Sequence, residues 1–181
     1  MILVDSHAEY LWLVRAAEKR VREEMAKLLV EINEEKTRIV DLAKAGSFSF
    51  LGFDFRRLKS RNNKWRTRYT PKLKKRTALL AKLKEIFRRY VSHPVGRIIE
   101  EINPILRGWV NYFGIGDSAD CFLYVKDWVE KKIRRHLMRA RQRRGFGWKR
   151  WSTEWLYGTL GLYNGYGIRR PSAFLKAIPV R

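Results

Sequence analysis

Hydrophobic residues recur every three or four positions over most of the chain, which is the spacing of an amphipathic helix. The stripes predict helices at residues 7–29, from Pro71 to the His93-Pro94 pair, at 95–102 and at 118–142. The run Ser6-His7-Ala8-Glu9 has the form of a capping box at the start of the first helix. Asn103 followed by Pro104 favours a fresh helix start, so a separate helix is expected at 104–113.

Alternation of aromatic and polar residues predicts a β-hairpin between these helices. Four phenylalanines at near-even spacing predict one strand over residues 47–55, with Gly52 at a bulge or a close backbone approach. The polar residues 61–64 predict a turn, and Trp65, Thr67 and Tyr69 alternate with Arg66 and Arg68 in the return strand. Residues 37–40 also favour β structure. The predicted fold class is therefore α+β, mainly α.

The charge of the chain changes this picture, because it is large and unevenly placed. Lys and Arg number 40 against 18 Asp and Glu, a formal net charge of +22. Residues 1–46 contain 8 of these bases and 9 of these acids, which leaves 32 bases and 9 acids for residues 47–181. The first stretch is thus nearly neutral, and the rest requires a polyanionic partner. Nucleic acid is the first expectation.

The clearest cationic pattern lies on the helix expected at residues 118–142. Four cations repeat every four residues, and a parallel apolar row is offset by two positions, or about 200° at helical pitch. The cations are Lys131, Arg135, Arg139 and Arg143, and the apolar residues are Val125, Val129, Ile133 and Leu137. Like charges at this spacing destabilise a helix by a few tenths of a kcal/mol per pair. We therefore expect one face to pack and the other to meet successive RNA phosphates rather than solvent alone.

Aromatic residues stand among the bases in two further blocks, residues 64–69 and 144–151. Aromatic faces stack on unpaired bases while Arg and Lys bind phosphates, as is typical of proteins that bind looped RNA. Any one of these rings can equally belong to the core, so the cations carry the prediction. The cations expected to bind RNA in these blocks are Arg66, Arg68, Arg144, Lys149 and Arg150.

Metal and catalytic signatures are weak. The lone Cys121 excludes an internal disulfide, and no cluster of Cys and His has zinc-ligand spacing. Adjacent glutamates point apart, and the three histidines lack Ser or Cys partners in a known arrangement. No apolar run approaches the roughly 18 residues of a membrane-spanning helix. We expect a cytoplasmic protein with no metal site of its own.

Three motifs follow one another in a specific order. They are Asn33-Glu-Glu-Lys-Thr-Arg-Ile39, Phe50-Leu-Gly-Phe-Asp-Phe55 and Ile102-Asn-Pro-Ile-Leu-Arg-Gly-Trp-Val-Asn-Tyr-Phe113. Together they resemble the C-terminal half of bacterial group II intron reverse transcriptase/maturases. The resemblance implies a palm remnant with its primer-grip hairpin at residues 1–70, and a basic helical thumb with the maturase-specific domain X at 71–181. The motif residues are Phe50, Gly52, Phe53, Asn103, Pro104, Arg107, Gly108, Trp109, Asn111 and Tyr112.

The same resemblance implies that catalytic parts are missing. In the family, a Tyr-Ala-Asp-Asp strand with two metal-binding aspartates precedes a stretch like Ile2-Leu3-Val4, whereas this chain starts at Met1. Asp5 matches neither aspartate. Two-metal nucleotidyl transfer needs both carboxylates, so this chain is not expected to polymerise alone. The Mg²⁺ would belong to the complete polymerase, and no cofactor is expected here.

The sequence therefore predicts an RNA-binding, maturase-type fragment that supports folding of intron RNA for splicing. In a complete enzyme it would also hold the template–primer duplex. Its expected partners are structured group II intron RNA and an RNA–DNA duplex. Two alternatives stay open. In the first, the chain is part of a split RNA-directed DNA polymerase, completed by a separate chain with fingers and palm. In the second, it is a general basic nucleic-acid-binding protein.

Overall fold

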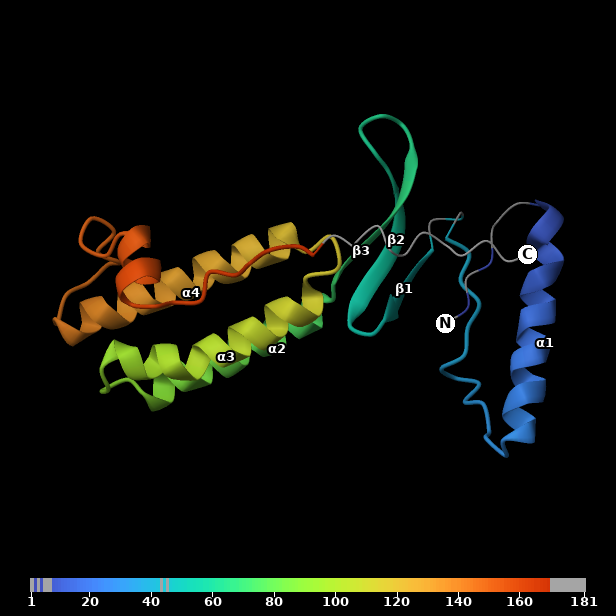
Figure 1. Ribbon diagram of the computed structural model, residues 1–181, viewed down its shortest axis with the longest axis horizontal. Helices are drawn as coiled ribbons and strands as arrows, with labels where there is room; N and C mark the ends of the chain where they lie inside the picture. Colours follow the sequence, from blue (N-terminus) through green and yellow to red (C-terminus); the bar gives the residue numbers. More distant parts are fainter. Residues whose placement is uncertain (1, 3, 5–7, 43, 45, 170–181) are drawn as a thin grey trace. The chain divides into compact units, whose positions relative to one another are not determined.

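A computed structural model describes residues 2, 4, 8–42, 44 and 46–169, and it is mainly helical with one antiparallel sheet (Figure 1). The elements in chain order are η1 (Ala8–Tyr10), α1 (Leu11–Lys27), β1 (Ser47–Phe50), β2 (Phe53–Lys59), β3 (Trp65–Pro71), α2 (Leu73–Arg89), α3 (Val95–Phe113), α4 (Ala119–Ala140) and a π-helical turn, η2 (Trp155–Thr159). This confirms the predicted fold class. Ser6 and His7 of the expected capping box lie outside the described residues. None of the described helices is long and apolar enough to cross a lipid bilayer.

The chain forms two compact units. One contains residues 1–48 and 56–67, and the other contains residues 49–55 and 68–181. In the first unit, α1 buries none of its side chains and forms ion pairs on its surface, such as Arg20 with Glu24 at 2.7 Å. Residues 37–40, expected to favour β structure, form no strand and are not part of the three-stranded sheet. The domain boundary expected after residue 70 stays a prediction.

The prediction of a single strand over residues 47–55 is wrong. These residues form β1 and β2, which pair with each other across a two-residue turn at Leu51 and Gly52. Both turn residues have positive φ, 48° and 82°, as a tight hairpin turn requires. Gly52 is therefore a turn residue rather than a bulge. Its carbonyl accepts a hydrogen bond from the Lys72 backbone N–H at 2.8 Å, which joins the turn to the start of α2. The turn and return strand expected after β2 are confirmed by β3.

The two helices expected at 95–102 and 104–113 form one continuous helix, α3, with Pro104 inside it. Six buried residues run through both halves on one face: Ile98, Ile99, Ile102, Leu106, Val110 and Phe113. Burial of this stripe outweighs the lost hydrogen bond at Pro104, which lies on the exposed side where water can bond the freed carbonyl of Glu100. Asn103 is not a helix cap. Its side chain donates to the Gly161 carbonyl at 2.8 Å and accepts from the Tyr163 backbone N–H at 2.9 Å.

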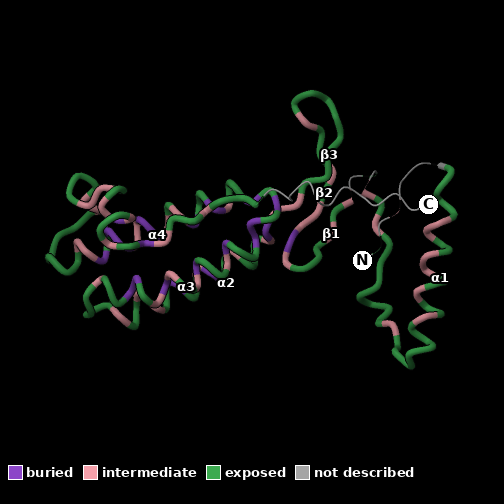
Figure 2. The backbone as a smooth tube through the Cα atoms, viewed as in Figure 1, coloured by how far each residue is buried: buried purple, intermediate pink, exposed green. Residues whose placement is uncertain are grey.

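The main core lies where α2, α3 and α4 pack against one another, and the buried positions face inward along these helices (Figure 2). Val125, Val129 and Ile133 are fully buried on α4, which confirms the packing face predicted for that helix. Leu156 of η2 and Leu162 complete the core. The segment after η2 returns along α3, since the Arg169 backbone N–H donates to the Gly114 carbonyl at 2.6 Å. This core holds α2 and α4 side by side.

Candidate nucleic-acid interface

A groove of about 390 Å³ runs between α2 and α4, and we call it the α2–α4 groove. Its lining residues are Lys84, Phe87, Arg88, Val91, Lys132, Arg135, His136 and Arg139. Five of the eight are cations, three from α4 and two from α2. No acid lines it. The groove thus joins charges from two helices that are far apart in the sequence.

The cations of this groove repel one another without local compensation. Burial lowers the pKa of the Lys132 ammonium, and the neighbouring charges of Arg135, Lys84, Arg139 and Arg88 lower it further. Within the part of the chain that the structure describes, none of these five side chains forms an ion pair. An anion placed in the groove would relieve this repulsion. A phosphate is the natural ligand for such a site.

The inner wall of the groove is neutral and fixed. His136 is buried, and its Nε2 donates to the His93 carbonyl at 3.1 Å. Burial lowers the pKa of His136 more than the hydrogen bond to the His93 carbonyl raises it, and the charge of Arg139 adds to the lowering, so the imidazole is neutral at pH 7. Phe87 packs edge to face against Trp128, with ring centroids 6.4 Å apart. The groove cations therefore stand beside a neutral wall that contains His136 and Phe87.

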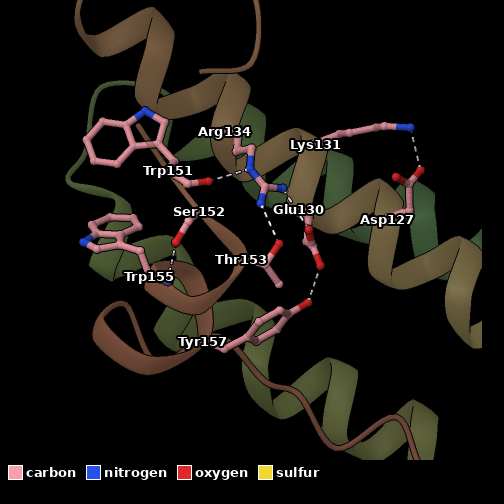
Figure 3. Close-up of polar contacts among 9 residues, drawn as sticks. All are labelled: Asp127, Glu130, Lys131, Arg134, Trp151, Ser152, Thr153, Trp155 and Tyr157. Carbon is pink, nitrogen blue, oxygen red and sulfur yellow. Dashed lines mark hydrogen bonds and ion pairs between the residues drawn. The ribbon is translucent and has the colours of Figure 1, made fainter. Parts of the chain in front are cut away.

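The structure splits the four-residue ridge predicted on α4. Arg135 and Arg139 are exposed and line the α2–α4 groove. Lys131 instead pairs with Asp127 at 2.7 Å (Figure 3), an acid four residues earlier whose pairing the sequence analysis did not anticipate. Arg143 lies beyond Ala140, where α4 ends. Lys84, Arg88 and Lys132 of the groove were not predicted as site residues.

The two hairpin cations belong to different compact units, and only Arg68 shares a unit with this groove. Arg66 is exposed on β3 in the first compact unit. Arg68 is exposed but pairs with Asp120 at 3.2 Å. Asp120 lies in the first turn of α4, and Arg135 follows it by 15 residues, or about 22 Å along the helix axis. The structure does not bring Arg68 and the groove cations together.

Arg144, Lys149 and Arg150 are exposed on the loop that follows α4. The chain after this loop is held to α4 by Arg134, which is 1% exposed (Figure 3). Its guanidinium donates to the Trp151 carbonyl at 2.9 Å, to Glu130 at 2.8 Å and to the Thr153 hydroxyl at 3.3 Å. The sequence analysis missed this anchor, although Glu130 four residues before Arg134 was a usable signal.

Tyr157 completes the buried network around Glu130. Its hydroxyl donates to the second Glu130 carboxylate oxygen at 2.7 Å (Figure 3). Burial raises the pKa of Tyr157, and the hydrogen bond to the Glu130 carboxylate raises it further, so the phenol stays protonated. The network is structural, because it fixes η2 and the preceding loop on α4 and reaches no groove.

Four of the α3 motif residues, Pro104, Gly108, Trp109 and Tyr112, line a second groove of about 660 Å³ between α2, α3 and the β1–β2 turn. Trp109 is half-buried and packs against Phe113, with centroids 4.7 Å apart, whereas Gly108 is exposed at the groove. The Tyr112 hydroxyl donates to the Leu51 carbonyl at 2.8 Å, which ties α3 to the turn. The other motif residues are placed as follows: Phe53 is buried in the core, Phe50 and Arg107 are exposed, and Asn111 accepts a hydrogen bond from Arg169 at 2.9 Å.

Reactive and metal-binding side chains do not gather in the described residues. No group of three or more His, Cys, Asp or Glu there could hold a metal ion. Cys121 is half-buried, and burial raises the pKa of its thiol, so it is not an activated nucleophile. The arrangement instead offers exposed cations and exposed aromatic side chains.

Comparison with known protein families adds one finding. Residues 76–155 match the family described as the maturase-specific domain of group II introns. The match begins in α2, spans α3 and α4, and ends at Trp155, so it contains every residue that lines the α2–α4 groove. A comparison with curated proteins finds none that matches.

Proposed function

Because residues 76–155 are a group II intron maturase-specific domain, we propose that this chain binds structured group II intron RNA through the α2–α4 groove. By holding the RNA strands together, the chain would support the fold that splicing requires. The observation that carries the proposal is the set of five uncompensated cations in the groove.

The spacing of these cations suits a phosphate backbone. Lys84 and Arg88 are one turn apart on α2, and Lys132 and Arg139 are separated by about 10 Å along α4. Packed helices lie 8–10 Å apart, so the two rows can grip several phosphates of one strand. Double-stranded RNA is recognised mainly by its shape and its backbone, which a groove lined by cations provides.

The second groove, between α2, α3 and the β1–β2 turn, supports a second role in holding a duplex, which the primer-grip resemblance also implies. Its wall is apolar and aromatic, and Lys75 and Lys82 of α2 stand at its edge seven residues apart. The β1–β2 turn closes one end. In a complete reverse transcriptase, this groove would hold the template–primer duplex.

A pair of matched variants tests the main proposal. Arg88→Gln, Arg135→Gln and Arg139→Gln together remove three unpaired groove cations. Arg89→Gln, Arg97→Gln and Lys131→Gln remove three cations from the same unit, each of which pairs with a nearby acid. Affinity for a group II intron RNA should fall by more than about tenfold in the groove variant and much less in the control.

The comparison RNA is an unrelated structured RNA of equal length. The proposal predicts tighter binding of the intron RNA by the parent chain and loss of that preference in the groove variant. Equal affinity for both RNAs would indicate a general basic nucleic-acid-binding protein instead. Equal losses in the two variants would show that net charge, rather than the groove, determines binding.

A further inference from the structure

The loop that follows α4 exposes a tryptophan on a fixed cation. Trp148 is 49% exposed, and the Arg134 guanidinium lies 4.3 Å from the centroid of its ring. Since Arg134 is itself buried, this contact lies on the protein side of the indole, and about half of the residue's surface stays exposed to solvent. Contact with a cation also orients the ring, because the guanidinium is attracted to the aromatic face.

The loop is held in this shape by its backbone and by its support. Gly145 and Gly147 have φ values of 95° and 63°, which residues with a side chain rarely adopt. A Cβ on Gly147 would lie 2.9 Å from the Met138 sulfur and 3.0 Å from Trp151 Cδ1, so a side chain here would have to displace Met138 and press on Trp151. Below the ring, Arg134 is fixed by hydrogen bonds from all three of its guanidinium nitrogens. The loop and Arg134 therefore hold the Trp148 indole in this orientation before any ligand binds.

The surroundings of Trp148 are cationic. Phe146 lies beside it with ring centroids 5.7 Å apart, and Arg135 of the α2–α4 groove lies over the Phe146 ring at 4.9 Å. Arg144, Lys149 and Arg150 are exposed on the same loop. A nucleic acid whose backbone occupied the α2–α4 groove would therefore reach the loop through Arg135.

We propose that Trp148 is a stacking platform for one unpaired nucleobase of the bound RNA, with cations of the 144–150 loop on the flanking phosphates. A flat aromatic surface among bases is how proteins commonly bind unpaired nucleotides. Bases within a helix have both faces covered by their neighbours, so the platform selects a bulge, a loop or an end. This inference rests on the proposed RNA binding and specifies the feature of the RNA that this loop recognises.

Two RNA probes of equal length test it: a hairpin with one unpaired 2-aminopurine in its loop, and a fully paired duplex. Trp148→Leu keeps an apolar cover over Arg134 but removes the flat aromatic face, and Trp148→Phe keeps a smaller one. Trp148→Leu should weaken hairpin binding roughly 5- to 150-fold and change duplex binding less than about twofold. Trp148→Phe should retain most of the hairpin affinity.

A matched control is Tyr124→Ala, because Tyr124 is 47% exposed with Arg76 at 4.3 Å from its ring. It should bind both probes as the parent does. The 2-aminopurine fluorescence should be quenched by the parent and not by Trp148→Leu, and circular dichroism checks that each variant is folded. Unchanged hairpin binding in Trp148→Leu, or equal losses for both probes, would overturn the platform alone. Failure of the parent to bind either probe while it binds a group II intron RNA would also overturn the platform, and failure to bind that intron RNA as well would overturn the proposed function.

Discussion

Two basic residues of α4, Lys131 and Arg134, each pair with an acid four positions earlier, yet their surroundings differ (Figure 3). The side chain of Lys131 is 45% exposed, and that of Arg134 is 1% exposed. Exposed pairs contribute little to stability, whereas removing one partner of a buried pair leaves a charge without compensation. The sequence spacing is identical, so only the returning chain after α4 distinguishes the two.

Glu130→Gln and Asp127→Asn test this difference with the same chemical change. Glu130→Gln leaves the buried Arg134 without its counter-charge and should lower the free energy of unfolding by about 3–5 kcal/mol. Asp127→Asn affects only the exposed pair and should change the free energy of unfolding by less than about 1 kcal/mol. Urea unfolding of both variants measures the difference. Similar losses would contradict the anchoring role of Arg134.

His136 provides a prediction about pH. Burial lowers the pKa of His136 in the folded chain, so the unfolded chain binds a proton at a higher pH, near its usual 6.5. Between these two pKa values the unfolded state holds more protons, and folding stability falls as the pH falls. The free energy of unfolding should therefore decline from pH 7.5 to pH 5.5. His136→Gln should reduce this decline, and His93→Gln should preserve it. An equal decline in parent and His136→Gln would contradict the role of His136.

At the scale of elements, α3 shows how a buried stripe overrides a local breaking signal. Asn103 and Pro104 favour a helix start by their own chemistry. In the folded chain, Ile102 and Leu106 on either side of them enter the same core, and the Asn103 side chain bonds to the segment after η2. Tertiary packing and a hydrogen-bond partner about sixty residues away keep α3 continuous. Neither can be predicted from the residues next to Asn103 and Pro104.

Pro104→Ala tests whether α3 is continuous. Alanine restores the missing backbone N–H inside a helix and should raise the free energy of unfolding by about 1–3 kcal/mol. Gly108→Ala, at an exposed position where a Cβ meets no atom within 4 Å, should raise it by about 0.5–1 kcal/mol. Urea unfolding measures both. A loss of stability in Pro104→Ala would instead indicate a separate helix beginning there.

How much of the structure the sequence could predict depends on how far apart in the chain the interacting residues are. Helical stripes predicted α4 and its packing face correctly, because both depend on neighbours within a few turns. The Leu51-Gly52 turn was missed because the phenylalanines around it keep the period of a strand. The α2–α4 groove was missed for another reason. Lys84 and Lys132 belong to helices whose relative placement is set by the core, and periodicity along one helix contains no information about another.

At the scale of the whole molecule, the cations of α1 and those of the α2–α4 groove differ in whether acids lie beside them. On α1, Lys19, Arg20, Arg22 and Lys27 all pair with glutamates nearby. In the α2–α4 groove, five cations converge with no acid among the lining residues. Residues 1–46 are nearly neutral and the rest of the chain holds the surplus charge. The proposed binding of a polyanion in the groove would account for this contrast.

The dependence of RNA affinity on salt tests this claim most directly. Each phosphate contact contributes about 0.7–0.9 to the slope of log affinity against log salt concentration. Titration of a group II intron RNA at several salt concentrations should give a steep slope for the parent. The variant with Arg88→Gln, Arg135→Gln and Arg139→Gln should reduce that slope by about 2–3, and the paired-cation control by less than about 1. A flat slope in the parent, or equal slopes in parent and groove variant, would contradict the account.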